Sequence, residues 1–513
     1  MKEKTRTQYA FLNIATGLGG YLINTILGFV CRMVFVRCLA QEYLGINGLF
    51  TNVLSMLSLA ELGIGSAIVY ALYKPLAENN QKKIAILVEF YRKAYMLIGL
   101  LVAVIGLILM PFIPYVVGEY SFKENIYVIY LLYLFASVSS YFFSYRSSLL
   151  QAAQKQYLVT GASYICTIFQ SIFQMIFLLV THEYMYYLVL NIVSSMVYNI
   201  FVSYLATKEY PFIKERCPEK LSKEELKDIS KNVWYLLTNK LASLLVSSTD
   251  NIITSYFQGL VTVGMASNYN ILITTLNNLL SQLFNGLTGG VGNFNVLKSE
   301  EETEQLFYSM NFANFWFYGL GAIGIALVSS DMVAVFFTSK YVLDLRIPIV
   351  LALNFYLVGL LTTVWIFKSA LGQFKYGRYV VLLTGILNII FSIILGRIWG
   401  LFGIYLATII ARLLTNAWYE PYALFKYKLH RSAKGCFIRV LEYTLVMIVA
   451  FVVCYFVCNL IDLGTMGNLI YHFCTVLILT NVIFYAFFRK VKEFEFFKSK
   501  AVSLSRILVG IIK

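Results

Sequence analysis

The sequence predicts an all-α membrane protein that crosses the bilayer many times. Hydrophobic residues make up 59% of its 513 residues and charged residues only 13%, a balance far from that of soluble domains. A spanning helix needs about 20 mostly apolar residues, and the chain contains fourteen runs of that kind. Runs of this length predict helices rather than the shorter strands of a membrane barrel.

The predicted spans follow one another with short connections. They lie at residues 9–36, 46–73, 84–116, 126–152, 157–180, 184–207, 233–257, 260–291, 306–336, 347–372, 378–397, 400–426, 437–461 and 468–488. The first run is longer than the apolar part of a secretory signal and lacks an A-x-A cleavage site, so we expect it to be retained. No connection could hold an ATPase or other catalytic domain, and no G-x-x-x-x-G-K-[ST] loop is present. The sequence therefore predicts a transporter that is not an enzyme.

Basic residues predict the orientation of these spans, because Lys and Arg are retained on the cytoplasmic side. Of the 41 Lys and Arg residues, 29 lie in one set of connections and tails, five in the alternate set and seven within spans. Both termini are therefore predicted to be cytoplasmic. The net charge of +15 then reflects topology, and we expect no nucleic-acid partner. The three histidines stand apart from one another and from the cysteines, so no metal site is expected.

The first six predicted helices recur as the next six, at an offset of about 220 residues. Gly45 in EYLGINGLF matches Gly264 in VTVGMASNY, and RSSLLQAAQKQY at 146–157 matches KSALGQFKYGRY at 368–379. Because six is an even number, both copies enter from the same side and the repeats are parallel. The pattern predicts two six-helix lobes that face each other across a cleft.

This repeat defines the expected organisation of the chain. It comprises an N-terminal lobe at 1–207, a cytoplasmic connector at 208–232, a C-terminal lobe at 233–430, two further helices at 431–490 and a basic amphipathic tail at 491–513. The tail mixes aromatic and basic residues, which fits either an interfacial helix or an ordinary basic tail that fixes topology.

Polar residues recur along one face of the eighth span, at spacings of three and four. They are Ser267, Asn270, Thr274, Asn277, Ser281 and Asn285. The repeat-related second span carries Thr51, Ser55 and Ser58, with Glu61 near the same face. Because polar groups are costly in lipid, such stripes indicate either a hydrated cavity that binds sugar hydroxyls or hydrogen bonds between packed helices.

Cations outnumber anions among the ionisable residues of the spans. The candidates for binding an anionic diphosphate are Arg146, Lys368, Arg32, Arg37, Lys240 and Arg412. Guanidinium groups bind phosphates bidentately, which suits this role. Arg146 and Lys368 hold nearly equivalent repeat positions near the cytoplasmic ends of the fourth and tenth spans. The alternative for both is snorkelling to the inner interface.

A charged pair of opposite sign occupies equivalent turns of the first and seventh spans. Subtracting an offset of about 219 from position 250 gives 31, so Asp250 matches Arg32 closely. Equivalent turns of parallel repeats lie at equal depth, so this pair is a candidate gate contact. Alternatively, each residue pairs within its own lobe, or Asp250, like Glu61, couples transport to a proton or Na⁺.

The sequence resembles the Wzx-type polysaccharide flippases, whose superfamily also includes multidrug and toxic-compound extrusion (MATE) transporters and the lipid II flippase. The resemblance rests on the fourteen-helix plan and on residues 42–78 and 248–269. It implies a MATE-like fold in the bacterial cytoplasmic membrane and alternating-access transport of undecaprenyl-diphosphate-linked oligosaccharide for capsule, exopolysaccharide or O-antigen. The implied partners are membrane lipids, a polysaccharide polymerase and glycosyltransferases, with no cofactor beyond a coupling proton or Na⁺.

Three other functions are compared with this one. A lipid II flippase carries the same lipid diphosphate and differs in the sugar-peptide part. A cation-coupled multidrug exporter fits less well, because cationic drugs favour acidic sites in the membrane. A membrane glycosyltransferase does not account for the two parallel repeats.

Overall fold

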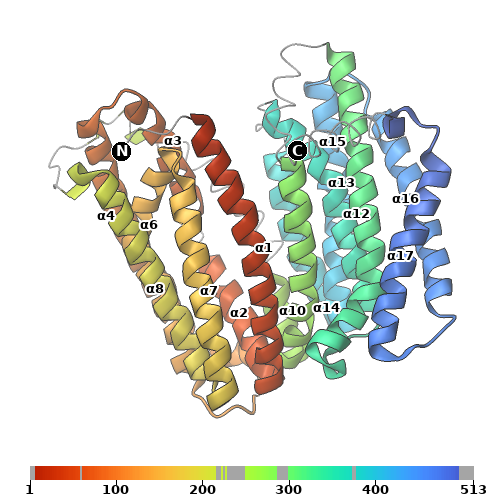
Figure 1. Ribbon diagram of the computed structural model, residues 1–513, viewed down its shortest axis with the longest axis horizontal. Coiled ribbons are helices and arrows are strands. Elements are labelled where there is room, and N and C mark those ends of the chain that lie inside the picture. The colour runs from red at the N-terminus through yellow and green to blue at the C-terminus, as the bar shows by residue number, and fades with distance from the viewer. Residues whose placement is uncertain are drawn as a thin grey trace, which may run out of the picture. The chain divides into compact units, whose positions relative to one another are not determined.

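The computed structural model consists of helices wherever it describes regular structure, and it divides into two compact units, Met1–Gly264 and Met265–Lys513. The structure describes residues 6–57, 61–118, 120–214, 249–285, 299–371 and 377–495, with a few positions between 221 and 227. Figure 1 labels most of the helices. Those of the first unit are α1 (Arg6–Cys38), α2 (Gln41–Leu57), α3 (Glu61–Ala77), α4 (Gln81–Leu109), α5 (Ile113–Val117), α6 (Ile126–Ala152), α7 (Gln156–Thr181) and α8 (Tyr184–Glu209). Helix α10 (Thr249–Asn285) crosses the unit boundary, and α12 (Glu300–Phe337), α13 (Arg346–Ala370), α14 (Arg378–Leu414), α15 (Asn416–Tyr427), α16 (Lys434–Cys458) and α17 (Gly464–Phe488) follow.

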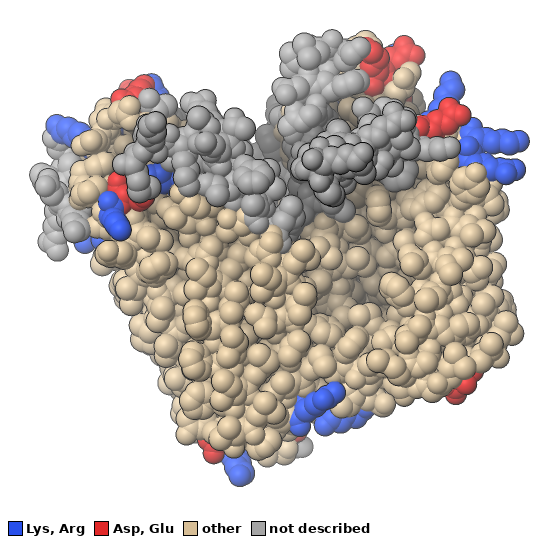
Figure 2. Space-filling view, in the orientation of Figure 1, with Lys and Arg blue, Asp and Glu red and all other residues tan. Residues whose placement is uncertain are grey.

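The chain is a multi-pass membrane protein. Among the described residues, ten helical segments are long and apolar enough to cross a bilayer. On the visible face of each unit, charged side chains lie towards the helix ends and the band between them carries none (Figure 2). That distribution is what a hydrocarbon layer requires of the protein surface.

One of these ten segments contains two of the predicted spans. Helix α14 includes Gly400, whose φ of 59° and ψ of −138° are not helical. Thr384 and Thr415 share a hydrogen bond of 2.7 Å, and Asn388 donates one of 2.8 Å to Thr408. In a straight helix, residues 31 positions apart would be about 46 Å apart, so α14 is a helical hairpin. Its turn falls between the predicted spans 378–397 and 400–426.

A kink and an undescribed stretch affect the comparison with other predicted spans. Helix α10 has a kink at Gly259 (φ 77°, ψ 170°), between the predicted spans 233–257 and 260–291. Most of the former span lies outside the described residues. The predicted span 46–73 corresponds to α2 and α3, and residues 58–60 lie outside the described residues. Within α2, Thr51 and Ser55 donate hydrogen bonds to the carbonyl groups four residues earlier.

The first unit is organised around α6, which contacts α2, α3, α4, α7 and α8. Buried tyrosines make several of these contacts: the Tyr133 hydroxyl donates to Asn47 Oδ1 of α2 at 2.6 Å and lies 3.0 Å from the Tyr184 hydroxyl of α8. Buried hydroxyls of this kind bond to one another because lipid offers no partner.

Helix α2 and the first part of α10 cross at two glycines. A Cβ atom on Gly45 would lie 2.0 Å from the Leu260 carbonyl oxygen, and one on Gly264 would lie 2.7 Å from the Gln41 carbonyl oxygen. Only glycine permits this approach. These are the two glycines matched by the sequence repeat. Because residues 249–264 pack here, the first compact unit extends well beyond residue 207, where the predicted N-terminal lobe ends.

The second unit is organised around α12, which contacts α13, α16 and α17. Aromatic rings fill the junction: Phe315 stacks on Tyr443 of α16 with ring centres 4.5 Å apart and lies 4.9 Å from Phe484 of α17. At another point, His472 Nδ1 of α17 lies 2.6 Å from Asp331 Oδ2 of α12. The two helices that follow the repeat are thus packed into the second unit.

Candidate functional site

Arg146 is the clearest cationic site of the first unit. It lies near the end of α6, where its Nη1 donates a 2.6 Å hydrogen bond to the Ser203 hydroxyl of α8 and its guanidinium lies 5.4 Å from the Tyr145 ring centre. Its Nε is buried without a hydrogen-bond partner. Among the described residues, no carboxylate pairs with this guanidinium. A half-buried positive charge matched only by a hydroxyl and an aromatic ring can accept an anionic ligand.

A neighbouring arginine shows the opposite arrangement. Arg92 of α4 donates a 2.8 Å hydrogen bond to Glu89, which also lies 3.5 Å from Lys93. The charge of Arg92 is therefore matched within its own helix. Arg146 and Arg92 therefore differ in whether a carboxylate pairs with the guanidinium.

The second unit contains a small polar cavity of about 190 Å³ between α10 and α13. Asn277 and Ser281 of α10 line one side, and Thr362, Trp365 and Ser369 of α13 line the other. Polar groups from two helices therefore face a space that could hold a ligand hydroxyl group or water molecules.

The hydrogen-bonding capacity of this cavity consists largely of donors. Tyr318 donates to Asn277 Oδ1 at 3.1 Å, which orients the amide and leaves its NH₂ group to donate. Within the described parts of the chain, neither that NH₂ group nor Trp365 Nε1 has a protein acceptor. The same holds for the Ser281 and Ser369 hydroxyls. Uncharged donors beside an aromatic face suit a polyhydroxylated ligand.

Lys368 directly precedes Ser369 of the cavity lining, but its charge is matched. Its ammonium group forms a hydrogen-bonded ion pair with Glu420 of α15. The side chain of Lys368 is 12% exposed and that of Glu420 only 1%. Since an unpaired charge at such a site is costly, the pair supports the structure of this unit and leaves Lys368 with less unsatisfied charge than Arg146.

The polar stripe of α10 occupies one side of that helix. Ser267, Asn270, Asn277 and Ser281 are half-buried and Thr274 is exposed. Residues on other faces, such as Tyr269 and Leu280, are buried. In the first unit, the Thr51 and Ser55 hydroxyls donate their hydrogen bonds to backbone carbonyls. The two stripes therefore differ in their capacity to bind a ligand.

The remaining candidates are dispersed. Arg37 is exposed at the end of α1, and Arg32, Asp250 and Arg412 are half-buried. Lys240 and Ser58 lie outside the described residues, as do the side chains of Glu61 and Asn285 and the end of the tail from 496.

Sequence reasoning did not find Thr362, Trp365 and Ser369. They lie on one face of α13 at spacings of three and four, a periodicity that could have identified them.

The helices and polar sites define a multi-pass protein with the fold of a membrane transporter. Residues 12–288, more than half of the chain, match the family described as "Polysaccharide biosynthesis protein". The chain therefore belongs to the polysaccharide biosynthesis protein family. No curated protein matches it significantly.

Solved structures share the fold at low sequence identity. A structure described as "Lipid II flippase MurJ, inward closed conformation" is 17% identical with a TM-score of 0.67, and the match covers 93% of this chain and 99% of that one. An inward-facing multidrug resistance MATE family transporter of the MOP superfamily is 14% identical with a TM-score of 0.56, over 76% of this chain and 91% of that one. A MATE structure in a bent conformation is 12% identical with a TM-score of 0.51, over 80% of this chain and 95% of that one. The expected MATE-like fold is thereby confirmed.

Proposed function

We propose that this protein is a flippase that moves undecaprenyl-diphosphate-linked oligosaccharide units from the inner to the outer leaflet of the bacterial cytoplasmic membrane. Its products would serve capsule, exopolysaccharide or O-antigen synthesis. The observation that carries the proposal is the guanidinium of Arg146, which lies inside a membrane unit without a carboxylate partner among the described residues. A lipid diphosphate supplies the missing anion, and Arg binds phosphates in bidentate geometry.

The cavity between α10 and α13 supports a glycan as the other part of the substrate. Asn277, Ser281, Trp365 and Ser369 offer neutral donors and an indole face rather than a charge. Sugar hydroxyls accept such hydrogen bonds, and an apolar ligand that covered these donors would leave them unpaired at a cost in free energy, so these groups favour a polyhydroxylated ligand.

Two related substrates are less well supported. Lipid II shares the diphosphate, and the fold is similar to that of the lipid II flippase, but the family match is to polysaccharide biosynthesis proteins. A cation-coupled multidrug exporter would favour an unmatched carboxylate over an unmatched guanidinium. We therefore keep the polysaccharide precursor as the proposed substrate.

Transport would occur by alternating access across fourteen spans, with both termini in the cytoplasm and a proton or Na⁺ as the coupling ion. The crossing of α2 and α10 at Gly45 and Gly264 brings backbone atoms of the two helices into close approach. Packed elements that slide or separate at such a contact are one route to a conformational change. We expect it to form and break during transport.

The charged pair Arg32 and Asp250 is the proposed gate contact in this cycle. Export should fail in Arg32→Asp and in Asp250→Arg, because each change places two like charges at the same depth. The swapped double variant should recover export if the two side chains meet. Polymer export measured at matched expression tests this prediction. A swapped double variant that exports no better than the worse single variant would contradict a direct contact between the two side chains.

The function itself is tested by deleting the gene and identifying the undecaprenyl-linked intermediates that accumulate. The proposal predicts a completed oligosaccharide unit on the cytoplasmic side, cleared when the wild-type gene is restored. Accumulation of lipid II in its place would assign the protein to peptidoglycan synthesis, and no accumulation of any glycolipid would contradict a flippase.

A further inference from the structure

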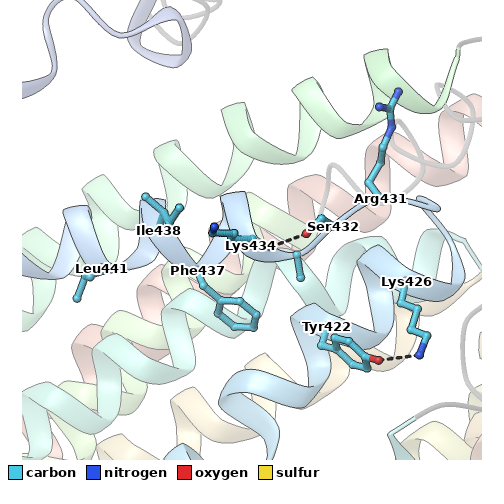
Figure 3. Close-up of a pocket in the computed structure, with 9 residues that line it drawn as sticks. Tyr422, Lys426, Arg431, Ser432, Lys434, Phe437, Ile438 and Leu441 are labelled. Carbon is cyan, nitrogen blue, oxygen red and sulfur yellow. Dashed lines mark hydrogen bonds between the residues drawn. The ribbon is translucent and has the colours of Figure 1, made fainter.

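The second unit has a larger pocket, of about 520 Å³, where the chain passes from α15 to α16. Figure 3 shows its lining side chains: Tyr422 and Lys426 come from α15, and Lys434, Phe437, Ile438 and Leu441 come from α16. The linking turn adds Arg431, Ser432 and Ala433. The pocket shares no lining residue with the cavity between α10 and α13. Its volume falls within the range of about 300–1,000 Å³ that is typical of small-ligand sites.

One part of this pocket is cationic. The Lys426 ammonium donates a 2.7 Å hydrogen bond to the Tyr422 hydroxyl, and Lys434 lies beyond Ser432 on the first turn of α16 (Figure 3). Neither lysine pairs with a carboxylate among the described residues. Arg431 is partly matched, because its Nε lies 3.9 Å from Glu304. The pocket therefore carries unmatched positive charge from two lysines.

The other part is apolar and continues along α16. Phe437, Ile438 and Leu441 are 36%, 47% and 60% exposed. The same helix continues with Leu445 and Ile448, which are also exposed. In a spanning helix, an exposed aliphatic face of this length meets lipid acyl chains. A pocket with a cationic end and an apolar stripe complements a lipid that has an anionic headgroup and acyl chains.

We propose that this pocket binds an anionic glycerophospholipid of the inner leaflet, such as phosphatidylglycerol. Its phosphate lies against Lys426 and Lys434, and an acyl chain follows Phe437, Ile438 and Leu441. Basic pockets at the cytoplasmic ends of spanning helices attract anionic headgroups, and the Lys and Arg distribution predicts that this end is cytoplasmic. The inference goes beyond the proposed function, since it concerns a bilayer lipid rather than the transported one.

The pocket fits a phospholipid better than the glycan-bearing substrate. Apart from its cations, only the Ser432 and Tyr422 hydroxyls are polar side-chain groups in its lining, and each already takes part in a hydrogen bond. A sugar would therefore find few partners here. A phosphate needs only the lysines, and the remaining wall is aliphatic or aromatic.

The test measures phosphatidylglycerol binding to the purified full-length protein in neutral detergent by native mass spectrometry. The double variant Lys426→Gln/Lys434→Gln should bind phosphatidylglycerol roughly twenty-five-fold more weakly than the wild type, because each lysine near an anionic lipid contributes about fivefold. Phosphatidylcholine should bind both proteins weakly and equally. The matched control is Lys490→Gln/Lys492→Gln, which removes the same charge from exposed residues outside the pocket and should bind as the wild type does.

Thermal unfolding without added lipid should be the same for all three proteins, which shows that the variants are folded. If both double variants lost the same amount of phosphatidylglycerol affinity, net charge alone would explain the effect, and the proposed site would be overturned. Equal binding of phosphatidylcholine and phosphatidylglycerol by the wild type would do the same. Tighter binding of undecaprenyl diphosphate than of phosphatidylglycerol, lost only in Lys426→Gln/Lys434→Gln, would overturn the proposed occupant in favour of the transported lipid.

Discussion

Arg146 in the first unit and Lys368 in the second hold nearly equivalent positions in the sequence repeat, yet their surroundings differ. Arg146 contacts a hydroxyl group and an aromatic ring. Lys368 forms an ion pair with Glu420, which is 1% exposed. The comparison teaches that a repeat conserves the position of a cation without conserving its role. We propose that Arg146 binds substrate and that Lys368 mainly stabilises its unit.

The polar stripes of the two units differ in the opposite sense. In the first unit, Thr51 and Ser55 are satisfied by backbone carbonyls. In the second, Asn277 and Trp365 face a cavity, and each has an N–H donor without a protein acceptor among the described residues. The hydrogen-bond donors of the first stripe are therefore used within its own helix, whereas those of the second remain available to a ligand.

The largest effect should come from breaking the ion pair of the second unit. Lys368→Ala leaves the buried Glu420 carboxylate without its partner, which typically costs about 3–5 kcal/mol. We expect a marked fall in thermal stability and in membrane abundance. Lys368→Ala/Glu420→Ala should recover much of that loss, since it removes both charges. Unchanged stability in Lys368→Ala would contradict the proposal that Lys368, unlike Arg146, mainly stabilises its unit.

A smaller effect should follow from widening the crossing of α2 and α10. In Gly45→Ala, the new Cβ would lie 2.0 Å from a backbone oxygen, so the helices must separate; overpacking of this kind costs about 1–3 kcal/mol. Export should fall while the protein still reaches the membrane. In the matched control Gly48→Ala, the new Cβ would lie 3.6 Å from the nearest atom, a Val263 methyl group. Equal effects of the two substitutions would argue against a close crossing.

The smallest effect should come from single groups of the glycan cavity. Asn277→Ala and Trp365→Leu each remove hydrogen-bond donors worth about 0.5–1.5 kcal/mol. We therefore expect a few-fold rise in the substrate concentration needed for half-maximal transport. Trp365→Leu should leave stability unchanged, whereas Asn277→Ala should also lower it, because the buried Tyr318 hydroxyl loses its acceptor. Flipping should be compared for substrates with long and short glycans. A short glycan that does not reach the cavity should be transported equally by both variants and the wild type.

The sequence predicted an all-helical membrane protein, because the length of an apolar run indicates a span. The ten spanning segments among the described residues do not by themselves confirm the predicted fourteen. The sequence also separated the two arms of α14 on either side of Gly400, where a left-handed glycine turns the chain. It did not predict which carboxylate meets Lys368, because Glu420 lies 52 residues away. The same limit applies to Asp331 and His472, which are 141 residues apart. Helical periodicity gives the face of a residue, whereas its partner depends on how helices pack.

The central claim is that Arg146 holds the diphosphate of a lipid-linked oligosaccharide during flipping. It is tested in vesicles that contain the purified full-length protein, by measuring how fast undecaprenyl-diphosphate-linked oligosaccharide becomes accessible on the opposite leaflet. Lys93→Ala is the control, because that side chain carries the same charge in the same unit and is 70% exposed.

Arg146→Ala should slow flipping at least tenfold, consistent with the loss of one charged hydrogen-bonding group worth about 1.5–3 kcal/mol. Arg146→Lys should retain a substantial part of the rate, and Lys93→Ala should flip as the wild type does, all with unchanged thermal stability. Wild-type flipping by Arg146→Ala would contradict the account.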